Sequence, residues 1–170
     1  MANTYEAIAT VTVGAGGAAN IEFTSIPGTY TDLVVKYSLR CTVTETGTNL
    51  RINGSSASTY SWRDLRSDGS TASSVNATSQ SEFLGGRMTL STDTANTFSN
   101  NEIYIPNYAG SNNKSVSIET VTENNATTSL IALIAGIRAN TDAITSLTWT
   151  PSSGNFAQYS TATLYGIKNS

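Results

Sequence analysis

Apolar and polar residues alternate along most of this chain with the two-residue period of a half-buried β-strand. In residues 115–122, every second residue from Val116 is Val, Ile or Thr, and the residues between them are Ser, Glu and Val. No segment shows a sustained helical period. Further segments with alternating or β-branched patterns are also predicted strands: residues 7–13, 21–24, 33–41, 49–53, 60–66, 82–90, 102–105, 130–138, 144–150 and 161–168.

Two of these segments depart from simple alternation. In residues 130–138, "LIALIAGIR", the odd-numbered and the even-numbered positions are both mostly apolar. We favour a central strand buried on both faces, and a helix is the alternative. Residues 82–90 contain Gly85-Gly86, which predicts a bulge or a tight turn inside the strand.

The segment "VTVGAGGAANIEF" (residues 11–23) has the outline of a dinucleotide-binding fingerprint, with Asp32 about twenty residues beyond its first glycines. A bound pyrophosphate needs a helix after the last small residue. Here residues 20–24 alternate like a strand and end at Pro27-Gly28. We therefore interpret residues 14–18 as the glycine-rich turn of a β-hairpin.

The strand pattern, broken by turns and by no helix, predicts an all-β fold. We expect an antiparallel β-sandwich, jelly-roll-like, with about ten strands in one domain spanning residues 1–170. Hydrophobic residues make up 38% of the chain and charged residues only 12%, so Ser, Thr, Asn and Gly supply most of the polarity. This composition suits sheets and turns better than helices.

Residues 55–81 are dominated by small polar residues and are predicted to form a long loop with one short strand around Trp62. Such a segment is either a plain surface excursion or a contact surface, and the sequence leaves both open. Aromatic and Arg side chains anchor many interfaces. The candidate interface residues in and beyond this segment are Tyr60, Trp62, Arg63, Arg66, Tyr104 and Tyr108.

Charge argues against a nucleic-acid partner, because the net charge is −3 and the nine basic residues are scattered. No apolar run has the length of a membrane span. The N-terminal residues have neither a basic flank nor an apolar core, so no secretory signal is expected there.

Candidate chemistry is sparse, and we expect no enzyme, no cofactor and no metal site. The chain has no His and one Cys, so neither the usual zinc ligand set nor a Cys–His nucleophile is available. Cys41 is expected to be a buried small hydrophobe. Residues 67–70 are interpreted as a turn rather than as a calcium loop. Glu119 and Glu123 are interpreted as solvated acids rather than a glycosidase pair.

Four stretches carry a resemblance to a known group: "FTSIPGTYTDLVV" (23–35), "EIYIPNYAGSNNKS" (102–115), "TENNATTSLIALIAGI" (122–137) and "TPSSGNFAQYSTATLYGIKNS" (150–170). The chain resembles, nearly end to end, the small β-rich virion structural proteins of tailed phages of aquatic bacteria, cyanophages among them. The closing "LYGIKNS" is the most distinctive part. Residues 55–81 match least well.

The resemblance implies assembly in the host cytoplasm and a final location on the virion surface. It implies a capsid decoration (cement) protein that binds the major capsid protein as a homotrimer. The alternative is a tail-fibre or spike module that binds a host surface glycan or protein. No coiled-coil heptads or collagen-like repeats, which would form a fibre shaft, are present, and this favours decoration.

Overall fold

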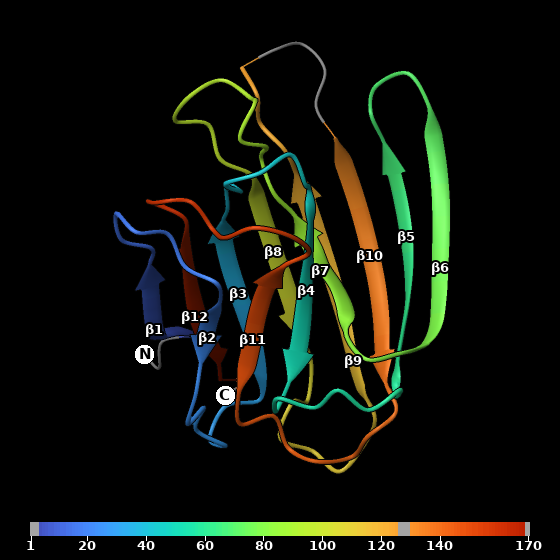
Figure 1. The fold of residues 1–170 in the computed structure, drawn as a ribbon. Helices are drawn as coiled ribbons and strands as arrows, with labels where there is room; N and C mark the ends of the chain where they lie inside the picture. Colours follow the sequence, from blue (N-terminus) through green and yellow to red (C-terminus); the bar gives the residue numbers. More distant parts are fainter. Residues whose placement is uncertain (1–3, 126–129, 169–170) are drawn as a thin grey trace.

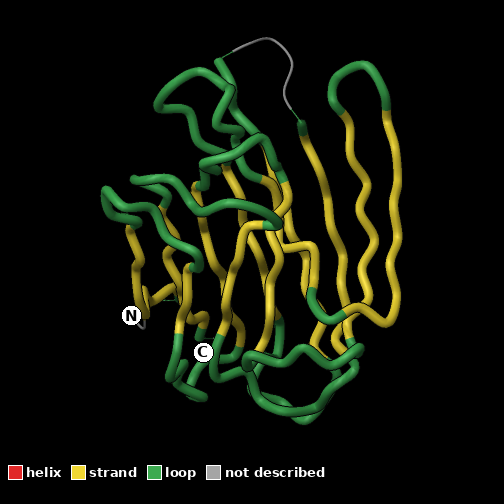
Figure 2. The backbone as a smooth tube through the Cα atoms, in the orientation of Figure 1, coloured by secondary structure: helices red, strands yellow, loops and turns green. Residues whose placement is uncertain are grey.

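The computed structural model describes residues 4–125 and 130–168, and this part of the chain forms twelve strands and no helix (Figure 1; Figure 2). Residues 126–129 and 169–170, which belong to two of the stretches compared above, lie outside it. The strands are β1 (Tyr5–Thr12), β2 (Ile21–Phe23), β3 (Asp32–Ser38), β4 (Gly47–Ile52), β5 (Tyr60–Ser67), β6 (Ala72–Gln80), β7 (Phe83–Arg87), β8 (Asn100–Ile105), β9 (Lys114–Val121), β10 (Ile131–Arg138), β11 (Leu147–Pro151) and β12 (Thr161–Ile167).

The strands form two antiparallel sheets that face each other. The large sheet has the order β1-β12-β3-β8-β9-β10-β5-β6, and the small sheet has the order β2-β11-β4-β7. If β1, β12 and the β8–β9 hairpin are left aside, eight strands remain. The large sheet then has the order β3-β10-β5-β6, and the small sheet keeps the order β2-β11-β4-β7. The nested pairs β2–β11, β4–β7 and β5–β6 are those of a jelly roll, so the predicted all-β, jelly-roll-like sandwich is confirmed.

Every predicted strand is present, with ends shifted by a few residues. The prediction for residues 55–81 was wrong, because this segment is not a long loop. It contains β5 and the whole of β6, which pair antiparallel as a hairpin. Residues 67–70 form its turn, as expected, and Asp68 accepts hydrogen bonds there from Ser70 and Thr71.

The glycine-rich segment at residues 14–18 forms a turn, in which the Gly17 amide donates to the Gly14 carbonyl at 3.0 Å. It is not the turn of a hairpin. β1 pairs with β12 in the large sheet and β2 pairs with β11 in the small sheet, so the segment carries the chain between sheets. No helix follows the glycines, in agreement with our rejection of a dinucleotide site.

The two sheets bury one continuous hydrophobic cluster between them. At its centre, Tyr37 Oη and Trp149 Nε1 both donate to the Gly85 carbonyl, at 2.8 and 3.2 Å. That carbonyl is available because β7 bulges at Gly85-Gly86, as the sequence predicted, with Gly86 at φ +109°. A side chain at Gly86 would meet the Tyr37 hydroxyl at 2.9 Å, so glycine is required on both counts.

The large sheet extends beyond the small one. In Figure 1, β5 and β6 stand at its edge, outside the strands of the small sheet. β10 was correctly predicted as a strand, but it is not buried on both faces. Ala132, Ile134, Gly136 and Arg138 point inward and are buried, while the alternate residues of β10 are exposed on the outer face.

Candidate functional site

The outer face of the large sheet carries an unusual group of exposed aliphatic residues, which we call the apolar strip. It runs along β10 and onto the strands that flank it. Leu133 and Leu65 are 57% and 58% exposed, and Ile131 and Ile137 are each about half exposed. The strip consists of Ile131, Leu133, Ala135 and Ile137 of β10, Leu65 of β5 and Val121 of β9.

The strand register makes these residues neighbours. Leu133 lies directly opposite Leu65 on one side, and Ile131 lies opposite Val121 on the other. Their alternation with buried residues fixes all of them on the face that points away from the small sheet. Fully burying a Leu or Ile side chain contributes roughly 1.5–3 kcal/mol, and these side chains are already about half buried, so each would gain a part of that in a contact.

The surface of the strip is uneven. Leu65, Leu133 and Glu119 form a row across β5, β10 and β9. Shallow hollows of about 460 and 480 Å³ lie on either side of this row, and all three residues line both. Small residues such as Ser74, Ser117 and Ala135 line the first hollow, and Ser67 and Ala72 line the second. The face therefore offers a ridge and two recesses.

Two opposite charges frame the first hollow. Arg63 of β5 is exposed on the outer face, and its Nη1 donates to the backbone carbonyls of Trp62 and Ala77 at 2.9 and 3.4 Å. Glu119 of β9 is exposed on the same face. In the part of the chain that the structure describes, neither side chain forms an ion pair. Neither charge is therefore balanced by an opposite charge within these residues.

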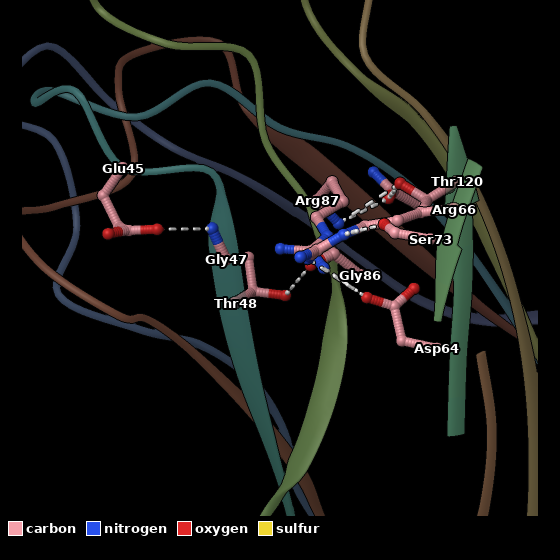
Figure 3. A network of polar contacts seen from close by, with 10 residues as sticks. Glu45, Gly47, Thr48, Asp64, Arg66, Ser73, Gly86, Arg87 and Thr120 are labelled. Atoms are coloured by element: carbon pink, nitrogen blue, oxygen red, sulfur yellow. Dashed lines mark hydrogen bonds and ion pairs between the residues drawn. The ribbon is translucent and has the colours of Figure 1, made fainter. Parts of the chain in front are cut away.

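Among the sequence-predicted interface residues, Arg63 is the one that lies beside the apolar strip. Its neighbours Trp62 and Arg66 point to the opposite face of β5. Trp62 is half-buried and packs against the core. Arg66 Nη1 lies 3.4 Å from Asp64 Oδ2 and its Nε donates to Ser73 Oγ at 3.3 Å, which holds it in an internal polar network (Figure 3).

Tyr60 and Tyr108 are fully buried, so the structure places these two candidates in the core rather than on a surface. The Tyr60 hydroxyl donates to the carbonyl of Ser55 at 3.0 Å, and its ring packs edge-on against Phe83 at 4.9 Å. The Tyr108 hydroxyl donates to the Pro27 carbonyl. Both hydroxyls are satisfied inside the protein, which is what a buried Tyr requires.

Tyr104 is partly exposed on the outer face of β8, where it lies directly opposite Ser117 of β9, and β9 separates it from β10. Its hydroxyl donates to Asp32 Oδ2 at 2.8 Å, and this hydrogen bond raises the pKa of Tyr104. Asp32 also accepts from the Asn107 amide at 2.8 Å. The pair fixes the turn after β8, so we assign it to that local structure.

Sequence reasoning missed the strip residues Leu65, Val121, Ile131, Leu133 and Ile137. The signal is the run "LIALIAGIR", apolar at odd and even positions alike, which by itself predicts burial on both faces. Only the three-dimensional arrangement shows that β10 has the small sheet on one side alone. When only one face of a sheet is covered, a strand with apolar residues at both odd and even positions exposes a row of apolar side chains on its other face.

The single cysteine, Cys41, is buried, as expected from the sequence. Its Sγ lies 3.5 Å from the Ser153 carbonyl. Within residues 4–125 and 130–168, no three acidic or Cys residues gather as metal ligands. None of the elements in these ranges is a helix that could span a membrane. Comparisons with protein-family models, curated proteins and solved structures found no significant match.

Proposed function

We propose that this protein is a non-enzymatic structural protein of a phage virion, and that it acts as a capsid decoration protein. The observation that carries the proposal is the apolar strip, displayed on a rigid sheet and framed by Arg63 and Glu119. Surfaces of this kind mark protein–protein contact sites. The virion location rests on the sequence resemblance, with the major capsid protein as the partner.

The sandwich suits such a role mechanically. Its sheets are held by a continuous core and by an ion pair between them, so the outer face keeps its shape when it docks. A preorganised surface loses little conformational entropy on binding, and more of the contact energy then appears as affinity. A decoration protein must hold a capsid lattice against internal pressure, and a rigid contact surface serves this.

The test is the copy number per purified virion, measured by quantitative mass spectrometry against the major capsid protein. We expect a ratio equal to that of the capsid subunits or a simple fraction of it. Capsids lacking the protein should bind it and melt at a higher temperature once it is added. Absence from the particle, or capsids that neither bind the protein nor gain stability, would refute the proposal.

One observation favours the tail-fibre or spike alternative. The first hollow is lined by Asn76, Arg63 and Glu119 beside Leu65, which is a mixture of polar and apolar groups that a glycan could occupy. In that case a few copies per virion are expected. The isolated protein should then adhere to host cells and block adsorption of the phage.

A further inference from the structure

We propose that the apolar strip is a self-association surface, and that its occupant is the same strip of a second copy of this chain, related by a two-fold axis. This inference goes beyond the proposed function, because it concerns the purified protein and requires no virion. It names the surface, the partner and the pairing of residues across the contact. On the capsid, the major capsid protein would take the place of the second copy at the strip.

The first support is the arrangement of charge. Arg63 and Glu119 flank β10 on β5 and β9, and Arg63 is one two-residue step further along the sheet than Glu119. Strands lie about 4.8 Å apart and a two-residue step is about 6.8 Å, so the two Cα atoms are about 12 Å apart. A two-fold axis midway between them, in the plane of the contact and perpendicular to the line that joins them, sets each Arg63 opposite the other copy's Glu119.

The second support is that the same axis brings the leucines at the middle of the strip together. Midway between Arg63 and Glu119 it crosses β10 between Leu133 and Ala135. Leu133 of each copy then contacts Leu65 of the other. Leu133 of each copy then enters the other copy's first hollow, which is lined by the small residues Ser74, Ser117 and Ala135. Such a self-complementary patch is what a two-fold contact requires.

The resulting contact has the anatomy of an established interface. An aliphatic centre, Leu65 and Leu133 from both copies, is closed at opposite sides by two Arg–Glu pairs. The charged pairs lie at the rim, where they set orientation and exclude wrong registers, while the leucines supply most of the affinity.

A two-fold contact adds copies in pairs. The homotrimer expected from the resemblance can still form through other surfaces. With or without trimers, the number of copies in the assembly should be even. Sedimentation velocity and native mass spectrometry of the full chain should show two copies, or six if trimers also form. An odd-numbered assembly alone, monomer or trimer, at the highest soluble concentration would overturn the inference.

Substitution in the strip tests its location. Leu133→Gln should weaken association by about thirtyfold or more, the loss typical of a central interface residue. Tyr159→Gln is the control, since Tyr159 is 62% exposed and lines neither hollow. Urea denaturation of both variants checks that they are folded. Equal association by both variants would place the contact elsewhere and overturn the inference.

Charge reversal tests the register. Arg63→Glu and Glu119→Arg should each abolish association, because each sets like charges face to face twice. An equimolar mixture of the two variants should associate again, since every contact between them then pairs opposite charges. The double reversal in one chain should behave like the original protein. A mixture that stays dissociated, while each variant is folded, would overturn the two-fold pairing.

Discussion

Arg87 Nη2 lies 2.6 Å from Asp64 Oδ2, and this ion pair joins β7 of the small sheet to β5 of the large one (Figure 3). The Asp64 side chain has no exposed area, and that of Arg87 is nearly buried. Arg66 shares the same carboxylate oxygen at 3.4 Å. One acid therefore balances two guanidinium groups at the point where the small sheet ends.

Asp64→Asn should lower the free energy of unfolding by about 3–5 kcal/mol, because it leaves Arg87 buried with no opposite charge. Urea denaturation monitored by tryptophan fluorescence measures this. The control is Glu102→Gln, which breaks the exposed pair between Lys36 and Glu102 at 2.9 Å and should cost no more than about 1 kcal/mol. Equal losses for the two variants would contradict the special role of the buried pair.

Gly136 tests the packing beneath β10. A Cβ atom there would lie 2.6 Å from Cε1 of Phe83 and 3.0 Å from Cγ2 of Val116. Gly136→Ala should therefore destabilise the fold by roughly 1–3 kcal/mol, the usual result of overfilling a tight core. Thermal and urea denaturation would both show it.

A second substitution shortens the Phe83 side chain that the added methyl group at residue 136 would meet. Phe83→Leu costs stability by itself, but it makes room beside Gly136, so the Phe83→Leu/Gly136→Ala double variant should be more stable than the sum of the two single changes predicts. Simple additivity would mean that the added methyl group does not meet the Phe83 ring.

The fold class could be read from the sequence because strand period and turn residues act locally. Alternation in residues 115–122 gives the two faces of β9 correctly, and Gly85-Gly86 gives the bulge in β7. β6 could not be found this way. Its sequence, "ASSVNATSQ", has almost no apolar alternation, since the strand is exposed on both faces and is held by pairing with β5.

The candidate site was harder to predict, since it depends on which strands the small sheet covers. Aromatic residues were among the predicted interface residues, yet Tyr60 and Tyr108 are buried and their hydroxyl groups are hydrogen-bonded inside the protein. Arg63 was identified, but its neighbours Leu65 and Leu133 were not. Residue type alone indicates candidates for an interface, whereas the location of an exposed apolar face depends on long-range strand order, which a single sequence does not encode locally.

Replacing the buried Arg138 is expected to stabilise the fold, whereas replacing Asp64 is expected to destabilise it. It is 3% exposed, and its Nε and Nη1 have no partner among the described residues. Its guanidinium lies 5.6 Å from the centroid of the Tyr60 ring, and its cross-strand neighbour is the buried Lys114. Burial, together with the charge of Arg138, lowers the pKa of Lys114.

Arg138→Met should raise the free energy of unfolding by about 1 kcal/mol or more, because it replaces an unpaired buried charge with an apolar side chain of similar length. The pKa of Lys114, followed by NMR, should rise at the same time. Lys36→Met on the exposed face is the control and should change stability little. A clear loss of stability in Arg138→Met would show that the contact with the Tyr60 ring outweighs the burial of charge.

Asp68 gives the pH dependence of the β5–β6 turn. Its Oδ1 accepts hydrogen bonds from the Thr71 amide at 2.8 Å and from the amide and hydroxyl of Ser70 at 2.9 Å. These bonds, chiefly that from Thr71, lower the pKa of Asp68 from 3.8 to about 2. Because the folded pKa is below the unfolded one, the turn is fully stabilised above pH 3.8 and loses this contribution as the pH falls through about 2.

NMR titration should show the amide resonances of Ser70 and Thr71 moving together with a midpoint near pH 2, the pKa of the carboxylate that they bind. In Asp68→Asn both amides should lose this titration, because the side chain no longer ionises. The same variant should leave the apolar strip and self-association unchanged, since the turn lies at the end of the hairpin. A midpoint near 3.8 in the unchanged protein would mean that the carboxylate is free in solution and that the turn closes without it.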